Sequence, residues 1–250
     1  MPTDAQIAEV RAANLALTGK IEADLAAFWR YVDLSKPATA RNALLNFVPL
    51  LVQRYGDMAA TISADWFEEL RFEAIDQGFL GKLATSTERS FTPKMASVDL
   101  AAVAAEVRFA AGDLFTDNPE AMLAKIQATS TRTVLQTGRE TTRLNTFAAG
   151  SGARGWARVT RPGSCRFCRA LAARGGVYTE RSVRFASHAP KCNCVSVPVW
   201  DKSAPEVDVM AYVASRNTAK MTDLQKEEQR TRVAAWLEQS FPGETDKPAA

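Results

Sequence analysis

The sequence predicts a mainly α-helical protein. A helical N-terminal body, residues 1–150, precedes a small α+β module, residues 151–200, and a C-terminal helix with a disordered tail, residues 201–250. Three observations lead to this prediction. Apolar side chains recur at helical spacing through most of the body. Glycines gather around residue 150, where that spacing stops. All four cysteines and the only histidine of 250 residues lie in the module.

A long amphipathic helix is expected to begin after Thr3, whose hydroxyl group suits an N-cap. Apolar side chains repeat at helical spacing over roughly eight turns, which predicts the length of this helix. These side chains are Ile7, Val10, Leu17, Ile21, Leu25, Phe28 and Val32.

Two further helices are expected between Pro37 and Ile75. Pro37 suits the first turn of a helix that runs through RNALLNFVPLLVQRYG. Pro49 should kink this helix because proline lacks an N–H, and Gly56 should end or bend it. Core side chains at helical spacing predict the third helix. They are Met58, Ile62, Trp66, Phe67, Leu70 and Phe72.

The rest of the body contains a connection and two more helices. Residues 76–96 are rich in Gly, Ser and Thr and have no sustained period, which predicts a connecting segment. Ser97 is the expected N-cap of a helix that ends near Gly112. Asn118, followed by a proline, is the expected N-cap of a helix that continues to Phe147.

The module alternates short strands with one short helix. A strand is expected over Trp156–Thr160, a helix in RFCRALAARGG, a strand from Val177, and a polar, basic loop up to His188. Valines that alternate with small or polar residues predict a last strand in VSVPV. A module of this size is expected to depend on a bound ion for stability.

The C-terminal part is expected to contain one helix. Thr222 and Gln225 have the spacing of a capping box at its start. The tail from Pro242 is polar and should be disordered.

The formal net charge of +3 hides an uneven distribution. Between Thr131 and Trp200, which we call the basic stretch, eleven arginines and one lysine stand against two glutamates, a net charge of +10. The other residues, 19 basic and 26 acidic, carry −7. This asymmetry favours contact with phosphate groups or with an acidic protein surface, although a solvated face has the same signature.

Two short clusters of metal-binding side chains occur in the module. Cys165 and Cys168 form C-x2-C, and His188, Cys192 and Cys194 form H-x3-C-x-C. Thiolates and an imidazole supplied by two such clusters are typical of a tetrahedral Zn²⁺ site. Five candidates compete for four positions, so one of them would pack or hydrogen bond beside the ion. Two disulfides or free buried thiols are the alternatives, and disulfides belong to oxidising compartments.

Several other classes of protein have little support in the sequence. The first residues, MPTDAQIAEVRAANL, have no basic region followed by an apolar core, so no secretory signal is expected. The longest apolar run, Leu44 to Val52, is interrupted by Asn46 and Pro49 and is shorter than a bilayer requires, so no membrane contact is expected. The chain has no phosphate-binding P-loop motif.

Catalysis also has little support. The only histidine belongs to the metal cluster, so a Ser/His/Asp or Cys/His hydrolase would lack a free base. A catalytic zinc keeps one position open for water, whereas this chain has enough ligands to close the site. We therefore expect a structural zinc ion and no enzymatic activity.

The order of the motifs along the chain is distinctive. GWARV precedes C-x2-C-x-A-L-A-x-R-G-x-V-Y, and F-x-x-H-x3-C-x-C precedes VPVW. Together with FWRYVDLSKPATARNALLNFVPLLVQRYGDMAATISADWFEELR, this order resembles the MuF-like minor capsid proteins of tailed bacteriophages, the head-morphogenesis family, in its actinobacteriophage branch. The resemblance covers roughly Phe28 to Trp200. One departure is that three residues separate His188 from Cys192, where the family usually has two.

This resemblance implies a minor capsid protein associated with the portal or the capsid interior, which assists head assembly and genome packaging or ejection. It implies the portal protein and the major capsid or scaffold proteins as partners. The expected location is the virion, inside the capsid near the portal, and the host cytoplasm during assembly. A capsid maturation protease or other metal-dependent hydrolase is the alternative, and a protein-interaction adaptor that ignores DNA is a third hypothesis.

The net charge of the basic stretch also predicts non-specific contact with double-stranded DNA, through the DNA phosphates. The residues expected to make this contact are Arg154, Arg158, Arg161, Arg166, Arg169, Arg174, Arg181, Arg184 and Lys191.

Overall fold

The computed structural model describes residues 2–76, 91–161, 164, 166–176, 185, 192–200 and 221–240. In chain order, the helices and strands are α1 (Asp4–Trp29), α2 (Pro37–Asp76), α4 (Leu100–Ala110), the 3-10 helix η1 (Ala111–Phe115), α5 (Ala121–Thr146), β1 (Gly155–Val159), α6 (Arg166–Ala172), β2 (Val195–Val199) and α8 (Asp223–Ser240).

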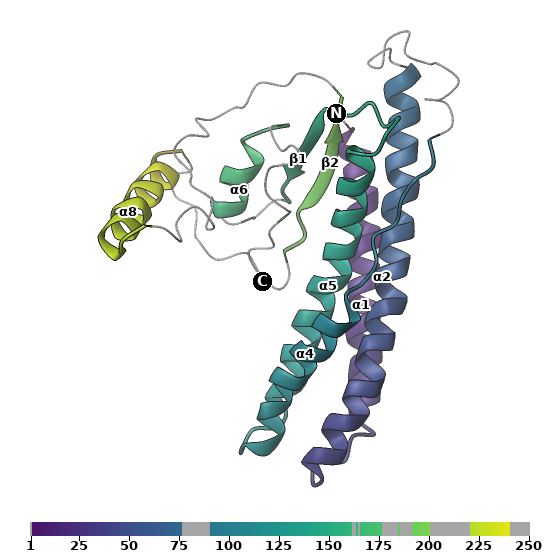
Figure 1. Cartoon of the computed structure of the whole chain (residues 1–250), viewed down its shortest axis with the longest axis vertical. Helices are drawn as coiled ribbons and strands as arrows, with labels where there is room; N and C mark the ends of the chain where they lie inside the picture. The colour runs from purple at the N-terminus through teal and green to yellow at the C-terminus, as the bar shows by residue number, and fades with distance from the viewer. Residues whose placement is uncertain are drawn as a thin grey trace.

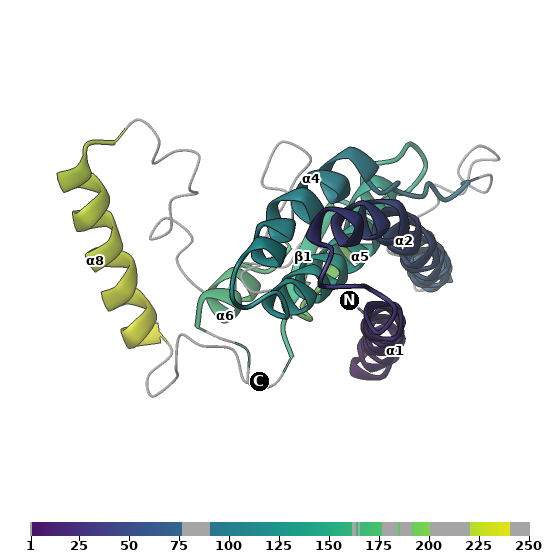
Figure 2. The same ribbon diagram turned by 90° about the horizontal axis from the view of Figure 1, so that it is seen from below.

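The long helices α1, α2 and α5 lie side by side and form an elongated body, with α4 packed against α2 and α5 (Figure 1). The two strands and α6 lie on one side of this body in Figure 1, and both views place α8 beyond α6 (Figure 2). The expected fold class is therefore confirmed. The protein is mainly α-helical, with a small α+β part that contains the cysteines and a helix near the C-terminus.

Two helix starts predicted from capping residues are confirmed. At α1 the Thr3 N–H donates to Gln6 Oε1 at 2.8 Å, and the Gln6 N–H donates to Thr3 Oγ1 at 3.3 Å. At α8 the Thr222 N–H donates to Gln225 Oε1 at 2.9 Å, and the Gln225 N–H donates to Thr222 Oγ1 at 3.3 Å. Each pair satisfies N–H groups that have no partner within the first turn.

Two other predicted caps are wrong. Asp99, and not Ser97, precedes α4, and its carboxylate accepts a hydrogen bond from a first-turn N–H at 2.9 Å. Helix α5 begins later than expected, and Glu120 at its N-cap position makes no side-chain capping bond. The carbonyl of Asn118 instead accepts the N–H of Ala121 in a turn that leads into α5.

Helix α2 is one continuous helix of 40 residues, so the expectation of two helices in this region is wrong. Gly56 lies within it because another part of the chain packs closely there. A Cβ on Gly56 would lie 2.3 Å from Cγ2 of Val98. Gly138 of α5 has a similar role, since its Cβ would lie 2.7 Å from Ser63 Oγ on α2. Packing along the length of the helix outweighs the low helix propensity of glycine and proline.

The main core lies inside the helical body. Apolar side chains from α1, α2, α4, η1 and α5 share it. Those with almost no exposed surface include Ile21, Leu25, Leu44, Val48, Val52, Met122 and Val134. Burial of this surface drives the assembly of the helices.

The strands β1 and β2, both near their predicted positions, form a two-stranded antiparallel sheet that is buried on both faces. Val159 pairs with Val195, which fixes the register. On one face, Val159, Val195 and Val197 pack against side chains of α1 and α2. Successive side chains of a strand point to opposite faces, so Trp156 and Arg158 lie on the other face. The sheet therefore packs on the helical body with one face and on the buried cluster that contains Trp156 and the cysteines with the other.

Some expectations fall outside the described residues. They are most of the predicted connection over residues 76–96, the strand from Val177, the loop up to His188, and the tail from Pro242. In the described end of that connection, residues 91–99, there is neither helix nor strand. Among the described helices, none combines the length and apolarity that crossing a bilayer requires.

Candidate metal centre

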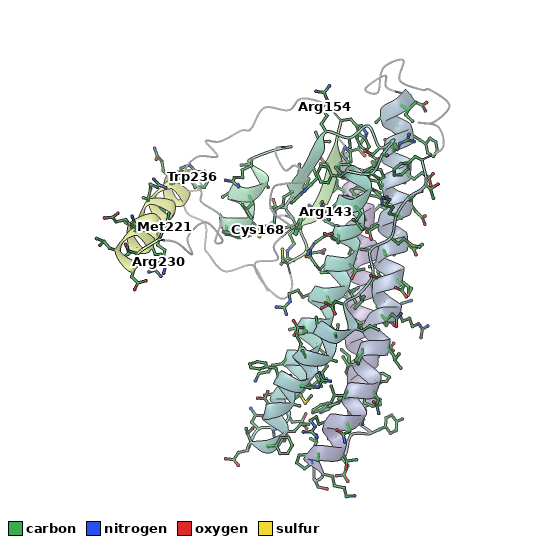
Figure 3. The ribbon with its side chains drawn as sticks, in the orientation of Figure 1. Arg143, Arg154, Cys168, Met221, Arg230 and Trp236 are labelled. Atoms are coloured by element: carbon green, nitrogen blue, oxygen red, sulfur yellow. The ribbon has the colours of Figure 1, made fainter. Side chains whose placement is uncertain are left out.

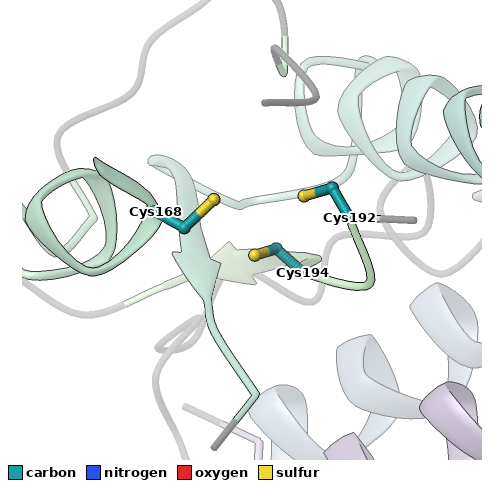
Figure 4. Close-up of side chains that lie close together, drawn as sticks. All are labelled: Cys168, Cys192 and Cys194. Carbon is teal, nitrogen blue, oxygen red and sulfur yellow. The ribbon is translucent and has the colours of Figure 1, made fainter. Parts of the chain in front are cut away.

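Three cysteine sulfurs lie together beside the sheet. Cys168 comes from α6, and Cys192 and Cys194 come from the segment that leads into β2. Their Sγ atoms all lie within 4.8 Å of one another, and their side chains point toward a common space (Figure 4). The three residues are 4%, 7% and 4% exposed. Within the described ranges, they are the one group of three or more His, Cys, Asp or Glu side chains close enough to share a metal ion.

Aromatic rings surround this group of sulfurs. Trp156 from β1 and Phe185 belong to the same buried cluster as the cysteines, and their ring centroids are 5.6 Å apart. The partly buried rings of Phe147 and Phe167 pack against that cluster. The second face of the sheet therefore packs on the cysteines and these rings, which keep solvent away from the sulfurs.

Two buried arginines lie next to the cysteines. Arg139 of α5 is 6% exposed, and its Nε donates to the carbonyl of Cys194 at 3.1 Å while its Nη2 donates to the carbonyl of Cys192. Arg158 of β1 is 3% exposed, and its Nη1 lies 3.8 Å from Cys168 Sγ. Both guanidinium groups also lie against the Phe185 ring, at 4.5 Å and 3.8 Å from its centroid. Positive charge thus lies beside the sulfurs, in a site with little exposure to solvent.

The thiols share their protons unequally. Hydrogen bonds from Cys168 and Cys194 lower the pKa of Cys192, and the positive charge of Arg139 adds to this effect. Hydrogen bonds with Cys192 and Cys194, together with burial, raise the pKa of Cys168. Among the three thiols, Cys192 is therefore the one whose pKa is lowered, while the pKa of Cys168 and that of Cys194 are raised.

The geometry fits a zinc ion better than a disulfide. Zn–S bonds of about 2.3 Å in a tetrahedron place sulfurs about 3.8 Å apart, which agrees with three sulfurs gathered within 4.8 Å. All three described cysteines are free, so none is bonded to another in a disulfide. These three cysteines would hold the ion, which would in turn join α6 to the segment before β2. The geometry thus supports a metal ion bound by these cysteines.

The remaining predicted ligands, Cys165 and His188, lie outside the described residues. Of the residues expected to contact DNA, Arg154 is exposed and lies beyond the start of β1, away from the cysteines (Figure 3). Arg158 is buried against Cys168 and Phe185, so it is not available to a DNA phosphate in this structure. The half-buried members of the set are Arg161, Arg169 and Arg174, and those whose side chains are not described are Arg166, Arg181, Arg184 and Lys191.

Sequence reasoning did not single out Arg139, or two other arginines that hold the segments on either side of β1 to the helices α1 and α2. Arg71 of α2 is 2% exposed and donates to the Gly150 carbonyl from Nε at 3.0 Å and from Nη2 at 2.8 Å. Arg11 of α1 donates to the Thr160 carbonyl at 2.6 Å. Helical spacing from neighbouring core residues was the only available signal, because a carbonyl partner distant in sequence leaves no local pattern.

The fold and the site together define a mainly helical protein in which three buried cysteines form a candidate metal centre at the junction of a helical body and a small sheet. A comparison with protein families assigns the chain more closely. Residues 1–219 match the family described as VG15 protein, so the chain belongs to this family of viral, phage-derived proteins. The resemblance noted in the sequence is thus confirmed at the level of a phage protein. No curated protein and no solved structure matches the chain.

Proposed function

We propose that this phage protein is a non-enzymatic minor capsid, or head-morphogenesis, component, in which a structural zinc ion holds a basic region on the helical body. The observation that carries the proposal is the convergence of three buried cysteine sulfurs within the stretch of highest positive charge. A closed, buried centre suits a structural ion, whose role is to hold segments together. The resemblance to MuF-like proteins and the VG15 family assignment support a role in the phage particle.

The expected position is inside the capsid near the portal, and the expected partners are the portal protein, the major capsid or scaffold proteins, and double-stranded DNA. The +10 charge of the basic stretch supports contact with DNA phosphates. Arg154, which is exposed, is the best described candidate for such a contact. The acidic helical body would instead face protein, because phosphate and net negative charge repel.

The alternative is a capsid maturation protease or other metal-dependent hydrolase. A catalytic metal needs an open position that water and substrate can reach. The low exposure of Cys168, Cys192 and Cys194 supports a closed site instead. Processing of the major capsid protein on co-expression, abolished by His188→Ala, would favour the enzyme.

The direct test of the proposed role is to locate the chain in purified virions and to measure zinc in the same particles. Presence of the chain in the virion together with its zinc supports a minor capsid component. Its absence from virions, with the protein confined to infected cells, would contradict a role as a component of the mature particle.

A further inference from the structure

The pair of buried arginines beside the cysteines carries an inference about how the metal centre is stabilised. Arg139 reaches the centre from α5 and donates to the carbonyls of both Cys192 and Cys194. Arg158 reaches it from β1 and lies 3.8 Å from Cys168 Sγ. The two arginines therefore contact all three cysteines, from two different elements of the fold.

Charge makes this arrangement unusual. A buried guanidinium group is costly unless a negative charge lies near it, and two such groups close together repel each other. The ionisable groups that act on Arg139 are Arg158 and the three cysteines, Cys192 first among them. Zn²⁺ with three thiolates carries −1, and with four thiolates −2, so a zinc–thiolate group would place negative charge next to both guanidinium groups.

We infer that Arg139 and Arg158 are positioning residues of the metal centre: they supply the countercharge for an anionic zinc–thiolate group, and Arg139 fixes the Cys192–Cys194 segment to α5. This inference rests on the proposed zinc centre and extends it. Because Arg139 belongs to the helical body, metal binding and attachment of the cysteine segment to that body are linked. Zinc therefore stabilises the junction between body and module as well as the module itself.

The test compares zinc affinity in wild-type protein and in the Arg139→Gln and Arg139→Lys variants, by competition with a chromophoric chelator. Loss of a contact beside the ligands typically weakens metal binding by about 10–100-fold. We expect a loss of that size for Arg139→Gln. Arg139→Lys keeps the charge but cannot donate to two carbonyls with the same planar geometry. The zinc affinity of this variant should therefore lie between that of the wild type and that of Arg139→Gln.

Arg71→Gln is the matched control. Arg71 is also buried and also donates twice to a backbone carbonyl oxygen, but its acceptor is Gly150, the last residue of the body, and not a cysteine. Its loss should lower stability and leave zinc affinity close to that of the wild type. Equal weakening by Arg71→Gln and Arg139→Gln would overturn the countercharge role, because any loosened junction would then give the same result.

A pH titration of zinc release adds a second measurement. The pH of release depends on the charge beside the thiols, whereas a weaker attachment of the module alone would not make it differ between the Gln and Lys variants. Removing a positive charge raises the pKa values of nearby thiols, so protons compete with zinc more effectively. Arg139→Gln should therefore release zinc at a higher pH than Arg139→Lys. If circular dichroism shows that Arg139→Gln is unfolded, Arg158→Gln and Arg158→Lys provide the same comparison at Cys168.

The outcomes separate the inference from the proposal beneath it. If wild-type protein holds no metal under reducing conditions, the zinc centre is wrong and the inference falls with it. If wild type binds zinc and the charge-removing variants bind it equally well with the same pH of release, the zinc centre stands and the inference is wrong.

Discussion

At the scale of single residues, the candidate metal centre brings together cysteines from two parts of the chain. Cys168 lies in α6, and Cys192 and Cys194 lie in the segment before β2. The C-x2-C and C-x-C spacings predicted these cysteines as candidate metal ligands, and the structure brings the three of them together. The spacings could not indicate which partners would surround them. Arg158 is an example: its positive charge suggested DNA, but the alternation of GWARV puts it on the same face as Trp156, and that face packs on the cysteines.

The fourth ligand can be predicted from charge. Cys165 would bring a negative charge to the ion, whereas His188 would bring none. Since Arg139 and Arg158 place two positive charges beside the sulfurs, we expect Cys165 to complete the site. Loss of a residue that only contacts a ligand weakens metal binding by up to about 100-fold. Cys165→Ser removes a ligand, so it should weaken zinc binding by more than this, and His188→Ala should have little effect.

Chelator competition on the two variants measures this difference. The matched pair also controls for general damage, because both substitutions fall in the same module. Strong weakening by His188→Ala with little effect of Cys165→Ser would contradict the charge argument.

At the scale of elements, Gly56 shows where helix boundaries predicted from the sequence differ from those that tertiary packing produces. Helix periodicity predicted the helices of the body, and β-branched alternation predicted β2. Gly56 suggested a helix end because glycine has low helix propensity. Its actual role depends on Val98, which lies far away in the sequence and leaves no trace near residue 56.

Alanine at Gly56 should therefore destabilise the protein. The added Cβ would lie 2.3 Å from Val98 Cγ2, and overpacking of this kind costs about 1–3 kcal/mol. Gly19 of α1 is exposed and has nothing within 4 Å of a Cβ, so alanine there should stabilise by up to about 1 kcal/mol through helix propensity. Chemical denaturation of both variants gives the two free energies of unfolding. A Gly56→Ala protein as stable as Gly19→Ala would contradict the close packing.

Metal removal should affect the elements unequally. The main core of α1, α2 and α5 does not include the cysteines, so these helices should keep their far-UV circular dichroism after chelation. The second face of the sheet would lose its metal-bound partner, and trypsin should then cleave faster at the arginines of the module. Digestion followed by mass spectrometry would locate the cuts. Equal acceleration of cleavage within α1 and α2 would contradict this division.

At the scale of the whole molecule, the module is attached to the body through a shared core and through arginine side chains. Val195 and Val197 pack with residues of α1 and α2. Arg11 and Arg71 donate to the carbonyls of Thr160 and Gly150, which lie on either side of β1 in the chain. The sequence predicted a change of character near residue 150, and Gly150, with a φ of 80°, lies at that change. Sequence alone could not predict the shared core, because its contacts join distant segments.

DNA binding tests the proposed role of the basic stretch. If the contact is to phosphates, affinity should fall steeply with salt, with a slope close to −0.9 per phosphate neutralised. Arg154→Glu should weaken binding, because Arg154 is exposed in the basic stretch. Arg54→Glu, the same change at an exposed position of α2, should have a smaller effect. Fluorescence anisotropy with a duplex at several salt concentrations measures both. Binding to portal assemblies with no DNA binding at any salt would favour the adaptor hypothesis.

The central claim, a closed zinc–thiolate centre, is tested most directly by counting metal and reactive thiols on the same sample of purified chain. We expect about one zinc per chain, as in structural sites, and cysteines that react with a thiol reagent only after chelation or unfolding. A metal-free chain whose four cysteines react freely in the native state, or are joined in disulfides, would contradict it.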